Sequence, residues 1–401
     1  MRAALLSLAM LAAMLSLAGR TVAAPPGGQK AATTIDSIVE PAMSADHLKS
    51  MLVQVRVDGR TVYSRAFGES MSGVPATTAM HFRNGAMAFT YMSTLLLELV
   101  DRKRVHLEDK LSTFFPALPH AKEITLKNLA DMTSGYADYV YQPELLQAYS
   151  RNPFRQWTPE ELIHIGVSKP IQFVPGTNWG YSHTNYVILG RVLEKVTGTS
   201  LDVALRRYVF RPLRMYETDG YSTPFVPEPV LHSFSSERRG DLGIKPGVPF
   251  SEESTFWNPS WTTAAGAVET TTIDDMNRSM EAVGRGVLLS TQSYHAQIDP
   301  LLAGFGHKDA KCPACNKLTA AGNYGLGVVN LGPWITQTKN FAGAGATAAY
   351  LPSKRIAISV ATTLLPEAFD DKGNYPTPSS AIVKALADAL APGTYPKPAA
   401  K

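Results

Sequence analysis

A tyrosine and a histidine two positions apart are the side chains of this sequence best suited to acid–base chemistry. Tyr181 and His183 flank Ser182 in a stretch that follows Pro175-Gly176. A histidine changes charge near pH 7 and can act as a general base, whereas a tyrosine hydroxyl can act as an acid or a nucleophile. Residues two apart reach one cleft together if they lie in a loop. The alternative for His183 is a hydrogen-bonded structural residue.

The stretch from His81 to Thr90 has the layout of a catalytic serine motif at the start of a helix. It reads His-Phe-Arg-Asn-Gly-Ala-Met-Ala-Phe-Thr and leads into an apolar helical run. It resembles the opening motif of the serine β-lactamase and D,D-peptidase family, in the class C-type, esterase-like branch, which is penicillin-binding-protein-like. The resemblance continues through Thr133-Ser134-Gly135, residues 175–186 and residues 261–276. It covers most of the chain from about residue 50 to 365.

The resemblance implies covalent chemistry for which this chain lacks the residues. In that family a serine attacks a carbonyl, and a lysine three residues later on the same helix face helps to remove its proton. Here Ala86 occupies the position of the nucleophile and Phe89 that of the lysine, and no Ser-x-x-Lys occurs anywhere in the chain. Loss of such a nucleophile costs many orders of magnitude in rate. A phenylalanine ring would also make the cleft drier and unfavourable to charge.

Two further family motifs are also altered. The second, Tyr-x-Asn, shuttles protons, and here Tyr181 is kept while His183 replaces the asparagine. The third, Lys-Thr-Gly or His-x-Gly, lies on a strand and helps to bind a substrate carboxylate. The resemblance places it on Gln337-Thr338-Lys339, where only Thr338 matches. The resemblance thus implies that Gln337, Thr338 and Lys339 line a ligand pocket.

Strand patterns occur at both ends of the chain, around a helical middle. A hairpin is predicted around Asp58-Gly59, and a helix over residues 185–197 is predicted to stop at Gly198. The expected fold is of the α/β (α+β) class, with an antiparallel sheet built from N- and C-terminal strands and flanked by helices, plus a mostly helical middle subdomain. The other predicted elements are strands over 52–57, 61–67, 324–330, 344–351 and 356–362 and helices over 93–100 and 380–390.

The N-terminus has the layout of a secretory signal peptide. Arg2 precedes an apolar stretch, and Thr21-Val22-Ala23 offers small residues for cleavage after Ala23. The alternative is an uncleaved membrane anchor, although the apolar stretch is slightly short for one. Arg20 stands where a lipidated cysteine would be, so no lipid anchor is expected. We expect a secreted, periplasmic or cell-envelope protein with no transmembrane segment once the signal is removed.

The expected domain division follows from these patterns. A signal peptide over 1–23 and a flexible, Pro-, Gly- and Ala-rich leader over 24–45 precede a β-lactamase-like domain over 46–365. Residues 366–401 form a C-terminal helix and tail. Two subdomains are expected, a sheet subdomain from 46–82 and 295–401 and a helical one from 83–294.

The number and spacing of the cysteines favour a disulfide over a metal or redox site. Cys312 and Cys315, in Cys-Pro-Ala-Cys, are the only cysteines, which in an exported protein favours a local disulfide. A metal site or a redox pair remains an alternative, although no specific ligand spacing or helix start supports either.

The formal net charge of +4 over 401 residues is spread along the chain. Nucleic-acid binding is therefore not expected. No metal or other cofactor is expected either.

Two functions are open. The first is a catalytically impaired relative of the family that binds a cell-wall peptide, an acyl or lipid ligand, or a protein partner. The second is a hydrolase of the carboxypeptidase, β-lactamase or esterase type, with chemistry relocated to Tyr181 and His183. Covalent labelling by a penicillin would exclude the first, and absence of any hydrolysis would count against the second.

Overall fold

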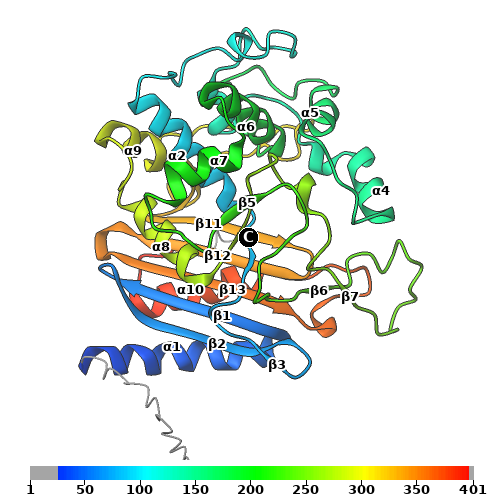
Figure 1. The fold of residues 1–401 in the computed structure, drawn as a ribbon, viewed down its shortest axis with the longest axis vertical. Coiled ribbons are helices and arrows are strands. Elements are labelled where there is room, and N and C mark those ends of the chain that lie inside the picture. The colour runs from blue at the N-terminus through cyan, green and yellow to red at the C-terminus, as the bar shows by residue number, and fades with distance from the viewer. Residues whose placement is uncertain (1–25, 397–401) are drawn as a thin grey trace, which may run out of the picture.

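An eight-stranded antiparallel sheet joins the two ends of the chain (Figure 1). The computed structural model describes residues 26–396. β1 pairs with both β2 and β13, so N- and C-terminal segments share one sheet and the predicted fold class is confirmed. The order is β3-β2-β1-β13-β12-β11-β10-β9. The strands are β1 (Leu48–Val57), β2 (Arg60–Met71), β3 (Val74–Pro75), β9 (Asn323–Tyr324), β10 (Val329–Leu331), β11 (Trp334–Phe341), β12 (Ala344–Leu351) and β13 (Ile356–Leu364).

Helices cover both faces of the sheet (Figure 1). On one face, α1 (Pro26–Ala45) and α10 (Pro378–Leu390) pack on the side chains that alternate outward, such as Val53 and Val360. On the other face, α8 (Ile273–Gly284) packs on β1, β12 and β13, and α2 (Met87–Asp101) runs buried above β11. The remaining helices form the upper layer: α3 (Leu126–Ala130), α4 (Pro143–Arg151), α5 (Pro159–Val167), α6 (His183–Thr197), α7 (Leu201–Leu205) and α9 (Thr291–Ile298).

The helix α1 corrects the prediction of a flexible leader over residues 24–45. Ile35 and Val39 are fully buried against the sheet, and their spacing of four gives the helix an apolar stripe. Asp36 accepts hydrogen bonds from Tyr63 Oη at 2.5 Å and Arg65 Nη1 at 2.6 Å on β2. Packing on the sheet therefore outweighs the local composition. The signal peptide expected over 1–23 lies outside the described residues.

The other predicted helices and strands differ less from those in the structure. The hairpin around Asp58-Gly59, the helices and the strands over 344–351 and 356–362 are all present. The strand predicted over 324–330 is wrong as one element, because a turn at Gly325–Val328 divides it into β9 and β10. The strand β11 was not among the predicted strand patterns. A small sheet of β4 (Phe82–Arg83), β8 (Val268–Thr271) and β5 (Asp219–Tyr221) was also missed in the helical middle.

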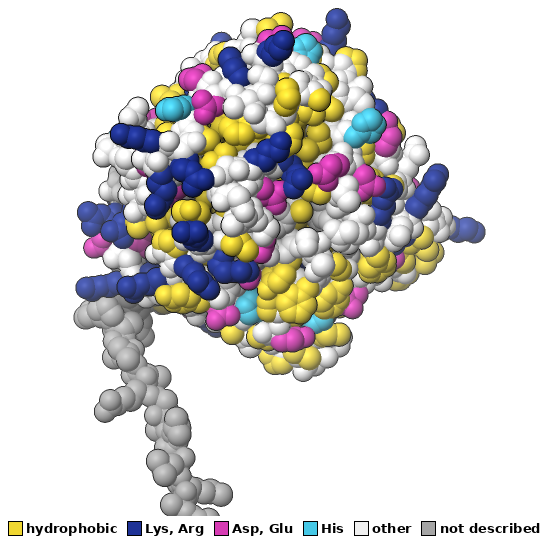
Figure 2. Space-filling view, turned by 45° about the horizontal axis from the view of Figure 1, so that its top comes forward, with side chains coloured by type: hydrophobic (Ala, Val, Ile, Leu, Met, Phe, Trp, Pro, Cys, Tyr) yellow, Lys and Arg dark blue, Asp and Glu magenta, His cyan; other side chains and the backbone are white. Residues whose placement is uncertain are grey.

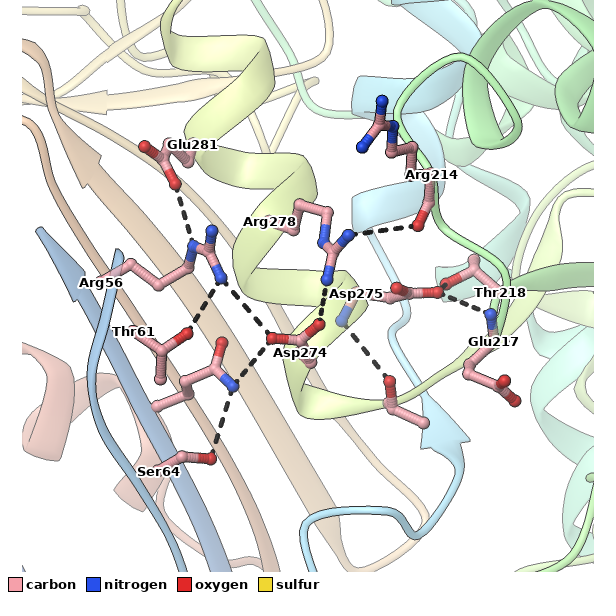
Figure 3. Close-up of polar contacts among 12 residues, drawn as sticks. Arg56, Thr61, Ser64, Arg214, Glu217, Thr218, Asp274, Asp275, Arg278 and Glu281 are labelled. Atoms are coloured by element: carbon pink, nitrogen blue, oxygen red, sulfur yellow. Dashed lines mark hydrogen bonds and ion pairs between the residues drawn. The ribbon is translucent and has the colours of Figure 1, made fainter. Parts of the chain in front are cut away.

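Ion pairs connect α8 to Arg56, near the C-terminal end of β1 (Figure 3). Arg56 Nε lies 2.9 Å from Glu281 Oε2, and Arg56 Nη1 lies 3.6 Å from Asp274 Oδ1. Asp275 accepts instead from the backbone N–H of Glu217 at 2.8 Å. The two adjacent aspartates of α8 thus face different partners and serve the packing of the helix.

On the face shown in Figure 2, side chains of both charges are present, with many lysines and arginines on the left of the view and apolar groups exposed between the charged ones. Among residues 26–396, no helix is long and apolar enough to span a bilayer.

Candidate active site

The start of α2 meets β11 at close range. The N–H of Ala86, the residue that caps α2, donates a hydrogen bond to Thr338 O at 3.3 Å. A Cβ placed on Gly85 would lie 2.5 Å from Lys339 Cβ, and Gly85 has a φ of +63°, so only glycine suits this position. The structure therefore brings the expected nucleophile position and the expected third motif together.

Phe89 lies inside an aromatic cluster. Its ring is 1% exposed and stacks on Tyr186 with the ring centroids 4.1 Å apart. Tyr181 and His183 lie at 5.9 and 5.6 Å from it. Tyr186 donates in turn to Ala130 O at 2.8 Å. The position expected for a lysine is thus a packed part of the core.

His183 is held by a buried carboxylate that the sequence did not reveal. Its Nδ1 lies 2.9 Å from Asp138 Oδ2, and the other carboxylate oxygen of Asp138 accepts from the backbone N–H of Val140 at 3.0 Å. A carboxylate on one ring nitrogen orients the imidazole and leaves the other nitrogen available. Asp138 is 45 positions away in the sequence, and no spacing rule connects it to His183.

Tyr181 and His183 line the same cleft, as expected. Tyr181 lies in the loop before α6, while His183 is the first residue of that helix. Their rings are 5.3 Å apart and nearly perpendicular. Burial, together with the nearby charge of Asp138, raises the pKa of Tyr181 well above its ordinary value. The Tyr181 hydroxyl therefore stays protonated near neutral pH, which disfavours the expectation that it acts as a nucleophile.

The cleft has a volume of about 340 Å³, and aromatic rings make up part of its walls. Thr338 and Lys339 line it. Gln337 does not line it, because its side chain is 2% exposed and its Nε2 donates to Gly327 O at 2.8 Å. The other lining residues are Gly85, Ala86, Phe89, Val140, Tyr141, Tyr181, His183, Trp261, Thr262, Asn340 and Phe341.

A disulfide supports the strand-like segment that leads into Tyr181. Cys312 and Cys315 are bonded, as predicted, and the backbone of Cys315 forms a β-bridge with Gly180. A Cβ on Gly180 would lie 3.2 Å from both sulfur atoms. The disulfide loop thus packs directly on the residue before Tyr181.

Comparisons with known proteins agree on one family. Putative penicillin-binding protein PbpX of Bacillus subtilis is 25% identical over 248 residues, which are 61% of this chain and 57% of that protein. Esterase EstB of Burkholderia gladioli is 26% identical over 275 residues, 63% of this chain and 70% of that protein. Penicillin-binding protein 4 of Amycolatopsis lactamdurans is 28% identical over 50% of this chain and 51% of its own. The chain thus spans about half the length of these penicillin-binding relatives.

Solved structures share the fold. D-amino acid amidase of Ochrobactrum anthropi SV3 matches with a TM-score of 0.72 and 21% identity, over 89% of this chain and 97% of that one. A D-stereospecific amidohydrolase of Streptomyces sp. matches with a TM-score of 0.70 and 21% identity, over 90% and 99%. The family model described as Beta-lactamase matches residues 35–378. The chain therefore belongs to the β-lactamase family.

Proposed function

We propose that this protein binds an amide-bearing peptide reversibly in the cleft and does not form an acyl-enzyme. The observation that carries the proposal is the pair Ala86 and Phe89 at the start of α2. Acyl transfer needs a nucleophile and a base within hydrogen-bond reach of it. A methyl group and a buried aromatic ring offer neither.

The backbone at the same place supports this proposal. Acyl transfer also needs N–H groups that point at the developing oxyanion. The N–H of Ala86 already donates to Thr338 O within the protein. The start of α2 thus supplies no free donor from this residue.

The cleft walls favour a ligand with apolar side chains and polar backbone groups. Tyr141, Tyr181, Trp261 and Phe341 offer rings, while His183 lies among them with a partly exposed imidazole. The relatives named above are an esterase, penicillin-binding proteins, a D-amino acid amidase and a D-stereospecific amidohydrolase. A cell-wall-type peptide with D-residues combines these features, and an acyl or lipid chain or a protein partner is the competing ligand.

Calorimetric titration tests this binding. Titrating D-phenylalanine amide and an N-acyl-D-alanyl-D-alanine peptide into the protein should give saturable heat and a product-free solution. Tyr141 is 66% exposed and lines the cleft, so Tyr141→Ala should weaken binding about tenfold. Tyr216→Ala is the matched control, because Tyr216 is 73% exposed and does not line the cleft. No heat from either ligand, or equal effects of both variants, would contradict the proposal.

A second function is favoured by the pairing of His183 with Asp138 at 2.9 Å. In this alternative His183 takes a proton from water while the water oxygen attacks the ester or amide carbonyl. The bond to the leaving group breaks as Tyr181 gives that group a proton, and His183 then returns its proton to Tyr181. Hydrolysis of p-nitrophenyl esters or D-amino acid amides should then exceed background. It should be lost in His183→Ala and reduced in Tyr181→Phe. Activity that persists in His183→Ala would exclude this mechanism.

We also propose that the protein is exported to the cell envelope. The layout of residues 1–23 supports export, and the relatives include penicillin-binding proteins. N-terminal sequencing of the protein from fractionated cells should begin at Ala24. Recovery of the full-length chain from the cytoplasm would contradict export.

A further inference from the structure

Behind the cleft lies a small chamber in which polar side chains have unused hydrogen-bonding atoms. It shares Trp261, Lys339 and Phe341 with the cleft, and its free volume is about 30 Å³. β11 supplies Lys339, the segment around β4 supplies His81 and Arg83, and β13 supplies Thr362. Three regions far apart in the sequence thus converge on it.

Each of these four side chains has a polar atom with no partner. Arg83 Nη2 donates to Pro224 O at 2.6 Å, but Nη1 is buried without a partner. His81 Nε2 lies 3.3 Å from Glu217, but its Nδ1 has no partner. Thr362 Oγ1 has none either, but Thr362 pairs with Met51 and its side chain lies on the face of the sheet that α1 and α10 cover. Lys339 Nζ has no hydrogen bond or ion pair among the described residues, and it lies 4.5 Å from the Phe341 ring centre.

Arg83 Nη1 and the Lys339 ammonium can donate hydrogen bonds but not accept them, and none of the described residues that line the chamber is an aspartate or glutamate. Lys339 and Arg83 are each only 6% exposed. A buried cation without a counter-charge is costly, and two such cations also repel each other. Burial and the charge of Arg83 accordingly lower the pKa of Lys339 to about 7, although Glu237 opposes the shift. Glu237 is itself buried, which raises its own pKa and reduces the charge that it can offer.

We propose that this chamber binds one compact anion of about the size of chloride, held by Lys339 and Arg83. Two buried cations that share a chamber without a counter-charge are complementary to an anion. The volume of about 30 Å³ has room for about two water molecules, and hence for a halide but not for a bulky organic acid. Because Lys339 lines both spaces, the anion sets the charge of the inner wall of the cleft.

A thermal-shift titration tests the site in the whole protein. Sodium chloride is titrated against sodium gluconate at constant ionic strength, at about pH 6, where Lys339 is protonated. Chloride should raise Tm saturably, because a ligand that binds only the folded state stabilises it, and gluconate should not. A halide-independent Tm in the wild-type protein would overturn the proposal.

Two variants and a control locate the effect. Lys339→Met should weaken the apparent chloride affinity at least tenfold, and Arg83→Gln, which removes the second charge, should weaken it by a similar factor. Lys354→Met, on the exposed turn after β12, should leave the affinity unchanged. A chloride-dependent shift of full size in Lys339→Met would place the anion elsewhere.

Bromide gives an answer that does not depend on variants folding. Crystals of the wild-type protein grown in sodium bromide should show an anomalous scattering peak between Arg83 Nη1 and Lys339 Nζ. Water in the chamber with no anomalous signal would overturn the proposal.

Discussion

The α2 side and the α6 side of the cleft differ in the polar groups that they carry. On the α2 side, Ala86 and Phe89 offer no reactive group, and Phe89 is part of the packed core. On the α6 side, His183 is oriented by Asp138 and lies beside a protonated Tyr181. The α2 side is fixed by packing, whereas His183 on the α6 side is fixed by its hydrogen bond to Asp138.

The largest effect is expected on the α2 side. Phe89→Lys should lower the free energy of unfolding by about 5 kcal/mol, because it removes a buried ring and buries an unpaired charge. Urea denaturation followed by circular dichroism measures this. Phe154→Lys is the control, since Phe154 is 60% exposed, and it should change stability by less than about 0.5 kcal/mol. A well-tolerated Phe89→Lys would show that the space is still open to a lysine.

The next largest effect on stability is expected at Lys339, which lines both the cleft and the chamber. Lys339→Met should raise the free energy of unfolding by about 3 kcal/mol near pH 6 in gluconate buffer. The folded-state pKa of Lys339, about 7, lies below the ordinary value of 10.5, so protonation penalises the folded state below pH 7. That penalty fades as pH rises from about 7 to about 10.5, where the lysine is neutral in both states.

The difference between variant and wild type should therefore shrink across this pH range. Parallel stability measurements from about pH 6 to about pH 10 check it. The exposed variant Lys354→Met should show no such trend. A pH-independent difference for Lys339→Met would mean that Lys339 carries no charge penalty.

A smaller loss is expected on the α6 side. Asp138→Asn should lower the free energy of unfolding by about 2 kcal/mol, because the amide keeps the shape but weakens the bond to His183. The imidazole should also lose its fixed orientation, so ligand binding in the cleft should weaken more than for Asp109→Asn, at a carboxylate near the remote α3. Calorimetry on both variants decides whether Asp138 acts on the cleft or only on the fold.

A loss of similar size is expected from removal of the disulfide. Replacing Cys312 and Cys315 together by serine should cost about 2 kcal/mol, since the closed loop is short. The loop packs on Gly180, so the change should also loosen Tyr181. Hydrogen exchange of the backbone around Tyr181 should accelerate, while that of α2 should stay the same. Equal acceleration in both regions would point to a global effect.

Much of the fold followed from local sequence patterns. The hairpin around Asp58-Gly59, the helix that stops at Gly198 and the placement of Ala86 and Phe89 at one helix start all depend on residues close in the chain. Helix α1 was missed, because the burial of Ile35 and Val39 comes from a sheet that the local composition does not report.

The contacts of the site were the harder part. Asp138 reaches His183 across 45 positions, and the chamber joins Arg83 of β4 and Lys339 of β11. Such contacts are set by tertiary packing, for which one sequence has no spacing signal. Gln337 was misplaced because its inward direction depends on how β11 sits against Gly327.

Intact-protein mass spectrometry after incubation with benzylpenicillin tests the central claim most directly. The same measurement on an active serine β-lactamase-family protein shows that the reagent acylates. The account predicts an unmodified mass for this protein, because Ala86 has no hydroxyl to acylate. A stoichiometric adduct with the mass of the penicilloyl group would contradict it.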